Sequence, residues 1–206
     1  MFDIQNYSSF IAAVLIFQLV PGPGTIAILN ATARNGARAG AAAVFGTLLG
    51  DFVFMVAAVA GLAAVLQANP IIFKALQWFG AGYLVWMGVQ LLRSKVSGEG
   101  TVAEPVRAPA VHFRQAFAVS LTNPKVILFF VSFFPLFLSP NSSPTTLVAM
   151  MVHVTVLSLV YQGALVLIGN RVALVMRGLP YARTLATRLA GVALIAFGIK
   201  LAAGNR

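Results

Sequence analysis

Two short motifs interrupt apolar stretches of the chain with residues that break helices. They are Pro21-Gly22-Pro23-Gly24, within FQLVPGPGTIAI, and Asn123-Pro124-Lys125. A proline inside a helix has no N–H to donate and displaces the carbonyl four residues before it. The carbonyls predicted to be released in this way are those of Phe17, Leu19 and Ser120. A broken helix offers carbonyls to cations at one end and N–H groups to anions at the other, so the motifs predict binding of a zwitterion.

A plain proline kink is the alternative for either motif alone, and two motifs in corresponding places favour a site. Two ionisable residues inside apolar runs strengthen this interpretation: Asp51 and Lys125. A charge within a bilayer costs about 2.5–3.5 kcal/mol, so such residues usually face an interior or a pathway. Asp51 could hold a substrate ammonium group or take up and release a proton, and Lys125 could hold a carboxylate. The alternative is a buried ion pair between them with a structural role.

Thr155, Ser158 and Gln162 add a polar face to another apolar run. At 100° per residue they lie within about 60° of one another on a helix. We expect this face to contact a substrate. Hydrogen bonding between helices is the alternative, because hydroxyl and amide groups often link membrane helices.

The composition identifies the environment of these residues. The chain has 206 residues, of which 60% are hydrophobic and 9% are charged, and its mean hydropathy is +0.92. Soluble domains contain about 25% charged residues, so we predict a membrane protein. Residues 1–6 carry Asp3 and no basic residue, and we expect no cleaved signal peptide. With no cysteine and two histidines, the chain offers little for a metal centre, and we predict neither metal nor cofactor.

Six apolar runs are long enough to cross about 30 Å of hydrocarbon as helices. They lack the alternating pattern of a membrane β-barrel. We therefore predict an all-α membrane protein with six transmembrane helices, of which helices one and four are broken at the proline motifs. The runs are residues 7–29, 41–66, 71–92, 115–138, 145–168 and 185–203.

The basic residues alternate between the predicted connections. Most of the 14 lie in or beside the first, third and fifth connections, few lie near the others, and Lys125 lies within a span. The positive-inside rule places the odd-numbered connections in the cytoplasm and both termini outside. This distribution accounts for the net charge of +10 without a nucleic-acid partner.

A polar segment divides the chain into two halves. Residues 94–113 are rich in Gly, Pro and charge, and we predict a cytoplasmic linker within one transmembrane domain of residues 1–206. Residues 1–93 and 114–206 then hold three helices each. Leu84, Gly88 and Leu91 recur in the second half, with the same spacing, as Leu194, Gly198 and Leu201. Because three crossings invert the second half, a duplication predicts two inverted three-helix repeats, which are common in secondary transporters.

These observations predict a carrier that works by alternating access, in which the two halves rock about a midplane cavity walled by the broken helices. A channel or inorganic-ion exporter is the alternative, although an ion pathway usually carries rings of like charge. An enzyme is not predicted, because the other acids lie at the terminus and in the linker. Asp51 is the predicted proton-coupling residue, and the predicted substrate-binding residues are Pro21, Gly22, Pro23, Gly24, Asn123, Pro124, Lys125, Thr155, Ser158 and Gln162.

A set of motifs along nearly the whole chain supports a family resemblance. They are Pro21-Gly22-Pro23, Gly36, Gly40, Gly46, Gly50-Asp51, Gly61-Leu62-Ala63, Asn123-Pro124-Lys125, Phe129-Phe130 and Phe134-Pro135. In this combination the chain resembles the LysE/RhtB family of amino-acid exporters. The resemblance implies a bacterial inner-membrane carrier that expels amino acids or close derivatives in exchange for protons. Its partners would be the amino acid, protons and the lipid bilayer, and formation of a homo-oligomer stays open.

The chain departs from the family at one position. The family often has glutamine after the proline near the end of helix four, where this chain has Leu136. If this position contacts the substrate, a more apolar substrate is expected.

Overall fold

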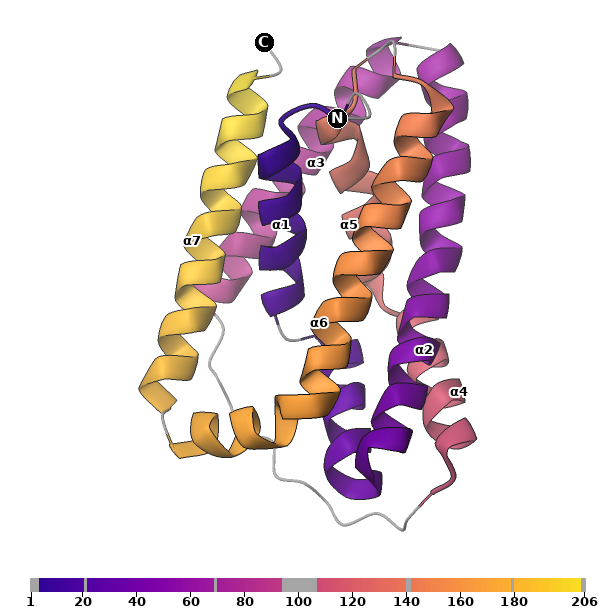
Figure 1. The fold of residues 1–206 in the computed structure, drawn as a ribbon. Helices are drawn as coiled ribbons and strands as arrows, with labels where there is room; N and C mark the ends of the chain where they lie inside the picture. The colour runs from indigo at the N-terminus through magenta and orange to yellow at the C-terminus, as the bar shows by residue number, and fades with distance from the viewer. Residues whose placement is uncertain are drawn as a thin grey trace.

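The computed structural model describes residues 4–20, 22–68, 70–93, 107–139, 142–178 and 180–204. All regular secondary structure in these ranges is helical, which confirms the predicted all-α class (Figure 1). Proline begins each α-helix from α2 to α7, because an N–H in the first turn has no partner within the helix. The helices are α1 (Tyr7–Leu19), α2 (Pro23–Ala68), α3 (Pro70–Arg93), α4 (Pro109–Leu121), α5 (Pro124–Phe133), the 3₁₀ helix η1 (Phe134–Phe137), α6 (Pro144–Gly178) and α7 (Pro180–Gly204).

The first helical run is divided between α1 and the start of α2. Val20 has extended backbone angles, φ −74° and ψ 108°, as expected for a residue that precedes a proline. The predicted release of the Phe17 carbonyl is wrong, because the N–H of Val20 donates to it at 3.3 Å. A tighter last turn of this kind commonly satisfies carbonyls at helix ends.

Helix α2 consists of two limbs that meet at Gly36. This residue has φ 78° and ψ −179°, a conformation essentially restricted to glycine. The chain reverses there, and the second limb passes back along the bundle (Figure 1). Gly36 therefore forms the turn between the two limbs of α2.

The second interruption separates α4 from α5. Thr122 and Asn123 lie between the two helices. The predicted release of the Ser120 carbonyl is also wrong, because the N–H of Asn123 donates to it at 3.0 Å. The helix α4 begins at Pro109, so the end of the segment assigned to the linker 94–113 is helical.

Glycines bring α4 directly against α2, and this is the most extensive contact between helices. A methyl group placed on Gly46 would overlap the carbonyl oxygen of Phe113, and one placed on Gly50 would lie 2.6 Å from the Cβ of Ser120. Small residues allow such close approach of helices. Gly46 and Gly50 are thus packing positions between α2 and α4.

The helices α3 and α7 form the second extensive contact. A methyl group on Gly88 would lie 2.5 Å from the Gly191 carbonyl oxygen, and one on Gly198 would lie 2.7 Å from that of Ala81. Figure 1 shows these helices running in opposite directions, with the start of α1 and the end of α7 at the same end of the bundle.

An aromatic core fills one end of the bundle between α1, α5 and η1. Phe10, Phe129, Phe133, Phe134 and Phe137 are completely buried. The Phe129 and Phe133 rings stack with centroids 4.4 Å apart, and Phe10 contacts the rings of both Phe133 and Phe137. These contacts hold α1 and α5 together above their broken ends.

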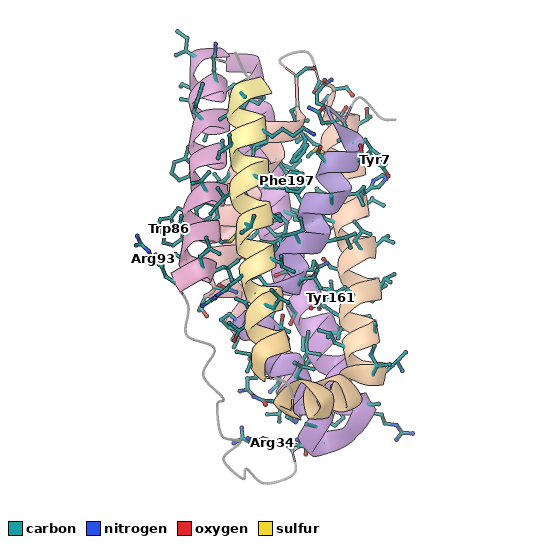
Figure 2. All side chains as sticks on the ribbon, turned by 90° about the vertical axis from the view of Figure 1, so that its left-hand side faces the viewer. Tyr7, Arg34, Trp86, Arg93, Tyr161 and Phe197 are labelled. Carbon is teal, nitrogen blue, oxygen red and sulfur yellow. The ribbon has the colours of Figure 1, made fainter. Side chains whose placement is uncertain are left out.

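The outer surface of the bundle is apolar. Ile71 and Leu167 are 80% and 82% exposed. By length and composition, two segments of the described helices could cross a bilayer, Pro23–Leu62 and Pro144–Ile168, and the first of these includes the reversal at Gly36. Figure 2 shows Trp86 on the outside of the bundle, and Arg34 at the opposite end from Tyr7.

Candidate functional site

A small polar cavity lies where the two interrupted helical runs meet. Its volume is about 60 Å³, which is room for a few water molecules. Residues from the interruptions, from the second limb of α2 and from α6 line it. They are Phe17, Gln18, Val20, Gly22, Gly24, Thr25, Thr47, Asp51, Ser120, Asn123, Val126 and Gln162.

In each interrupted run, a polar side chain near the end of the first helix forms a hydrogen bond with a neighbouring helix. Ser120, the penultimate residue of α4, donates a hydrogen bond from Oγ to Asp51 Oδ1 at 2.6 Å. Gln18, the penultimate residue of α1, donates from Nε2 to Ser158 Oγ at 2.9 Å. Hydrogen bonds to a carboxylate are among the stronger ones in proteins. These two contacts fix the broken helix ends to α2 and α6 beside the cavity.

The cavity also meets the beginnings of two helices. Gly24 and Thr25 belong to the first turn of α2, and Asn123 directly precedes α5. The first N–H groups of a helix have no carbonyl partner within it, and the helix dipole makes this end attractive to anions. The cavity therefore combines the carboxylate of Asp51, which suits a cationic group, with two helix N-termini, which suit an anionic group.

The structure brings together five of the residues predicted for the site: Gly22, Gly24, Asp51, Asn123 and Gln162. Pro23 is exposed and is not among the lining residues. Pro21 lies outside the described residues, as do the side chains of Pro124 and Lys125. The predicted pairing of Asp51 with Lys125 therefore stays a prediction.

The polar face predicted on α6 is divided in the structure. Gln162 lines the cavity, and the buried Ser158 supports Gln18 from behind. The Thr155 hydroxyl instead donates to the carbonyl of Met151 in its own helix at 2.8 Å, and Thr155 is not among the lining residues. A shared helical face does not distinguish these three outcomes, because threonine can satisfy its hydroxyl one turn back.

Several lining residues were not predicted. Gln18, Thr25, Thr47 and Ser120 are single polar residues within apolar segments. Their proximity to the proline motifs, or to Asp51 one turn away, is the signal that could have identified them. The Oγ1 of Thr47 and the Oε1 of Gln162 are buried and have no hydrogen-bond partner in the described part of the chain.

One wall of the cavity is apolar. Phe17, Val20 and Val126 form it, and the Phe17 ring stacks on Phe129 with centroids 3.6 Å apart. Leu136 is buried in the aromatic core against Gly80 and is not among the lining residues. The residues that could favour an apolar substrate are thus Phe17, Val20 and Val126, and none of them was predicted from the sequence.

The site offers no cluster of metal ligands within the described ranges, where no three His, Cys, Asp or Glu side chains come together. Its polar groups are hydroxyls, amides and one carboxylate. These groups can bind a small charged molecule by hydrogen bonding and charge.

Comparisons with known proteins agree over nearly the full length. Residues 15–205 match the family described as LysE type translocator. An uncharacterized membrane protein of Pseudomonas aeruginosa is 34% identical over 206 residues, which cover 97% of this chain and 95% of that protein. The leucine efflux protein of Klebsiella pneumoniae is 30% identical over 204 residues, covering 98% and 96%. That of Salmonella typhimurium is 33% identical over 160 residues, covering 77% and 75%. No solved structure matches.

Proposed function

Because the chain belongs to the family of LysE type translocators, we propose that it exports an amino acid with an apolar side chain, such as leucine, across the inner membrane of a bacterium. The family resemblance found in the motifs is confirmed by the match over residues 15–205. Relatives named leucine efflux protein support both an amino acid as substrate and a transport function without catalysis. The observation that supports this most directly is the cavity at the two broken helices.

The cavity has the chemistry that an amino acid requires. The carboxylate of Asp51 suits the ammonium group, and the first turns of α2 and α5 suit the carboxylate. The wall formed by Phe17, Val20 and Val126 suits an apolar side chain. The cavity thus offers a separate binding group for each of the three parts of leucine, which are the ammonium group, the carboxylate and the apolar side chain.

We propose that the helices form six spans in two inverted halves, residues 1–93 and 114–206. The contacts between α3 and α7 support this symmetry. The interval along the chain from Gly88 to Gly198 equals the interval from Ala81 to Gly191. The contact of Gly88 with Gly191 thus corresponds to that of Gly198 with Ala81. A two-fold axis between the helices would relate these contacts, as in inverted-repeat transporters.

The contacts at the broken helices support the same symmetry. Gln18 and Ser120 are both penultimate residues of their helices. Gln18 binds Ser158 in α6, while Ser120 packs on Gly50 in α2. A glycine of the first half, Gly61, recurs in the sequence of the second half as Gly169, and the interval from Gly50 to Ser158 is the same as the interval between these two glycines. Each interrupted run therefore contacts the second helix of the opposite half at an equivalent position.

Transport would proceed by alternating access, with a proton moving in the opposite direction to the amino acid. At about 60 Å³ the cavity is smaller than the roughly 300 Å³ or more usual for small-molecule sites. It must widen to admit leucine, and rocking of one half against the other would do so. We propose that the Asp51 carboxylate takes up a proton once the ammonium group has left, which would change the charge of the cavity between the two directions of movement.

Counterflow in proteoliposomes tests the proposal. Unlabelled leucine inside the vesicles should accelerate entry of labelled leucine, because a carrier exchanges substrate across the membrane and a channel does not. Asp51→Asn should fold and should lose the dependence of export on a proton gradient. Glu104→Gln, the same change of acid to amide in the segment between α3 and α4, is the control and should retain it. Absence of counterflow with every amino acid would exclude the proposed function.

A further inference from the structure

Thr47 differs from three other threonines of the described residues. The hydroxyls of Thr32, Thr122 and Thr155 each donate to the carbonyl of the residue four positions earlier in the chain, at 2.8 to 2.9 Å. This bond is the usual way to satisfy a threonine within a helix. The Oγ1 of Thr47 has no partner in the described part of the chain, although Thr47 is only 6% exposed.

Gln162, on α6, repeats this observation. The residue is 7% exposed, and its Oε1 has no hydrogen-bond partner within the described residues. Burying a polar atom without a partner is unfavourable. Thr47 and Gln162 both belong to the lining of the cavity of about 60 Å³, and two unsatisfied oxygen atoms in these residues indicate a ligand that donates hydrogen bonds to both when the cavity opens.

We infer that Thr47 Oγ1 and Gln162 Oε1, together with the Asp51 carboxylate, form the subsite for the primary ammonium group of the transported amino acid. The inference rests on the proposed function and assigns one end of the substrate. Thr47 lies one helical turn before Asp51, so both side chains extend from the same face of α2. An ammonium group has three N–H donors, and these residues supply three acceptors.

Ser120 holds Asp51 in this arrangement. One of the carboxylate oxygen atoms of Asp51, Oδ1, accepts the hydrogen bond from Ser120, which fixes the carboxylate beside the cavity. The ammonium group would thus lie between α2 and α6, across the cavity from the apolar wall. The substrate carboxylate would then lie toward the first turns of α2 and α5.

N-methylation of the substrate tests the subsite, because it removes one N–H from the ammonium group. A hydrogen bond to a charged group is worth about 1.5–3 kcal/mol. The concentration of leucine that half-saturates counterflow should therefore be about 10- to 100-fold lower than the corresponding concentration of N-methylleucine. In Thr47→Val and in Gln162→Met this preference should fall to a few-fold, since one acceptor is already missing. Thr32→Val makes the same substitution at a buried position of α2 outside the cavity and should keep the full preference.

A conservative variant and a salt control complete the experiment. Thr47→Ser keeps the hydroxyl and should keep the preference for leucine over N-methylleucine. If Thr47→Val does not fold, Thr47→Ala takes its place. The inference fails if Thr47→Val matches Thr32→Val while the wild type exchanges leucine. It also fails if Thr47→Val changes only the sodium dependence of exchange, because the oxygen atoms would then bind an inorganic cation. If the wild type exchanges no amino acid, the proposed function fails as well.

Discussion

Two glycines of α2 should respond in opposite directions to the same substitution. Alanine is favoured over glycine in a helix by about 0.5–1 kcal/mol. At Gly61, no atom lies within 4 Å of the added methyl group, so Gly61→Ala should stabilise the protein by about that amount. At Gly46 the methyl group would meet the backbone of α4 at Phe113 and Phe117. These atoms cannot rotate away, and overpacking of this kind costs about 1–3 kcal/mol.

After the helix propensity is subtracted, Gly46→Ala should lose up to about 2.5 kcal/mol of stability, and the overlap with the Phe113 carbonyl oxygen places the expected loss toward the upper end of this range. Unfolding of both variants can be followed by circular dichroism as dodecyl sulfate is titrated into mild detergent. Because Gly46 and Ser120 lie on the same contact between α2 and α4, Gly46→Ala should also reduce leucine exchange at temperatures where it remains folded. Midpoints that move in the same direction for Gly46→Ala and Gly61→Ala would contradict the packing explanation.

Three further predictions follow from single positions. Ser120→Ala removes the hydrogen bond to Asp51, worth about 1.5–3 kcal/mol, and should slow leucine exchange. Thr122→Ala should not, because the Thr122 hydroxyl donates to the Ala118 carbonyl at the end of α4. Leu136→Gln should destabilise the protein by about 1–3 kcal/mol without changing substrate preference in export assays; a changed preference in a stable variant would show that residue 136 reaches the substrate. The chain has no cysteine, so Ala37→Cys and Thr145→Cys can each be labelled alone with a membrane-impermeant maleimide. Labelling of whole cells should reach only position 145, and the opposite result would invert the proposed topology.

The sequence predicted the helical class well because its signals are local. Apolar runs of sufficient length predict helices, and prolines mark their beginnings. The interruptions at residues 20–22 and 122–123 also follow from local chemistry, since Val20 precedes a proline and takes an extended conformation. The fate of the carbonyls could not be predicted in the same way. It depends on whether the last turn tightens, and at Phe17 and Ser120 it does.

The site was predicted less completely because it depends on how the helices rotate against one another. Asp51 was identified because a charge within an apolar run requires an explanation. Thr47 also lines the cavity, yet the signal for it is weak, because it consists only of the position of Thr47 one helical turn before Asp51. Thr155 shows the opposite case, since it shares a helical face with Gln162 but bonds to its own backbone. Packing of α2 against α4 and of α2 against α6 selects which polar residues meet.

In the proposed arrangement of two inverted halves, the cavity would join a nearly symmetric scaffold to an asymmetric set of charges. Gln18 and Ser120 are each the penultimate residue of a helix that ends at an interruption. The interval that relates Gly50 to Ser158 relates Asp51 to Leu159, so the acid occurs in only one half. A symmetric ligand would gain nothing from this difference, whereas an amino acid has one cationic and one anionic end. Under the proposed mechanism, rocking of inverted halves would require the symmetry, and orienting a zwitterion would require that the symmetry be broken, as the single acid at Asp51 would do.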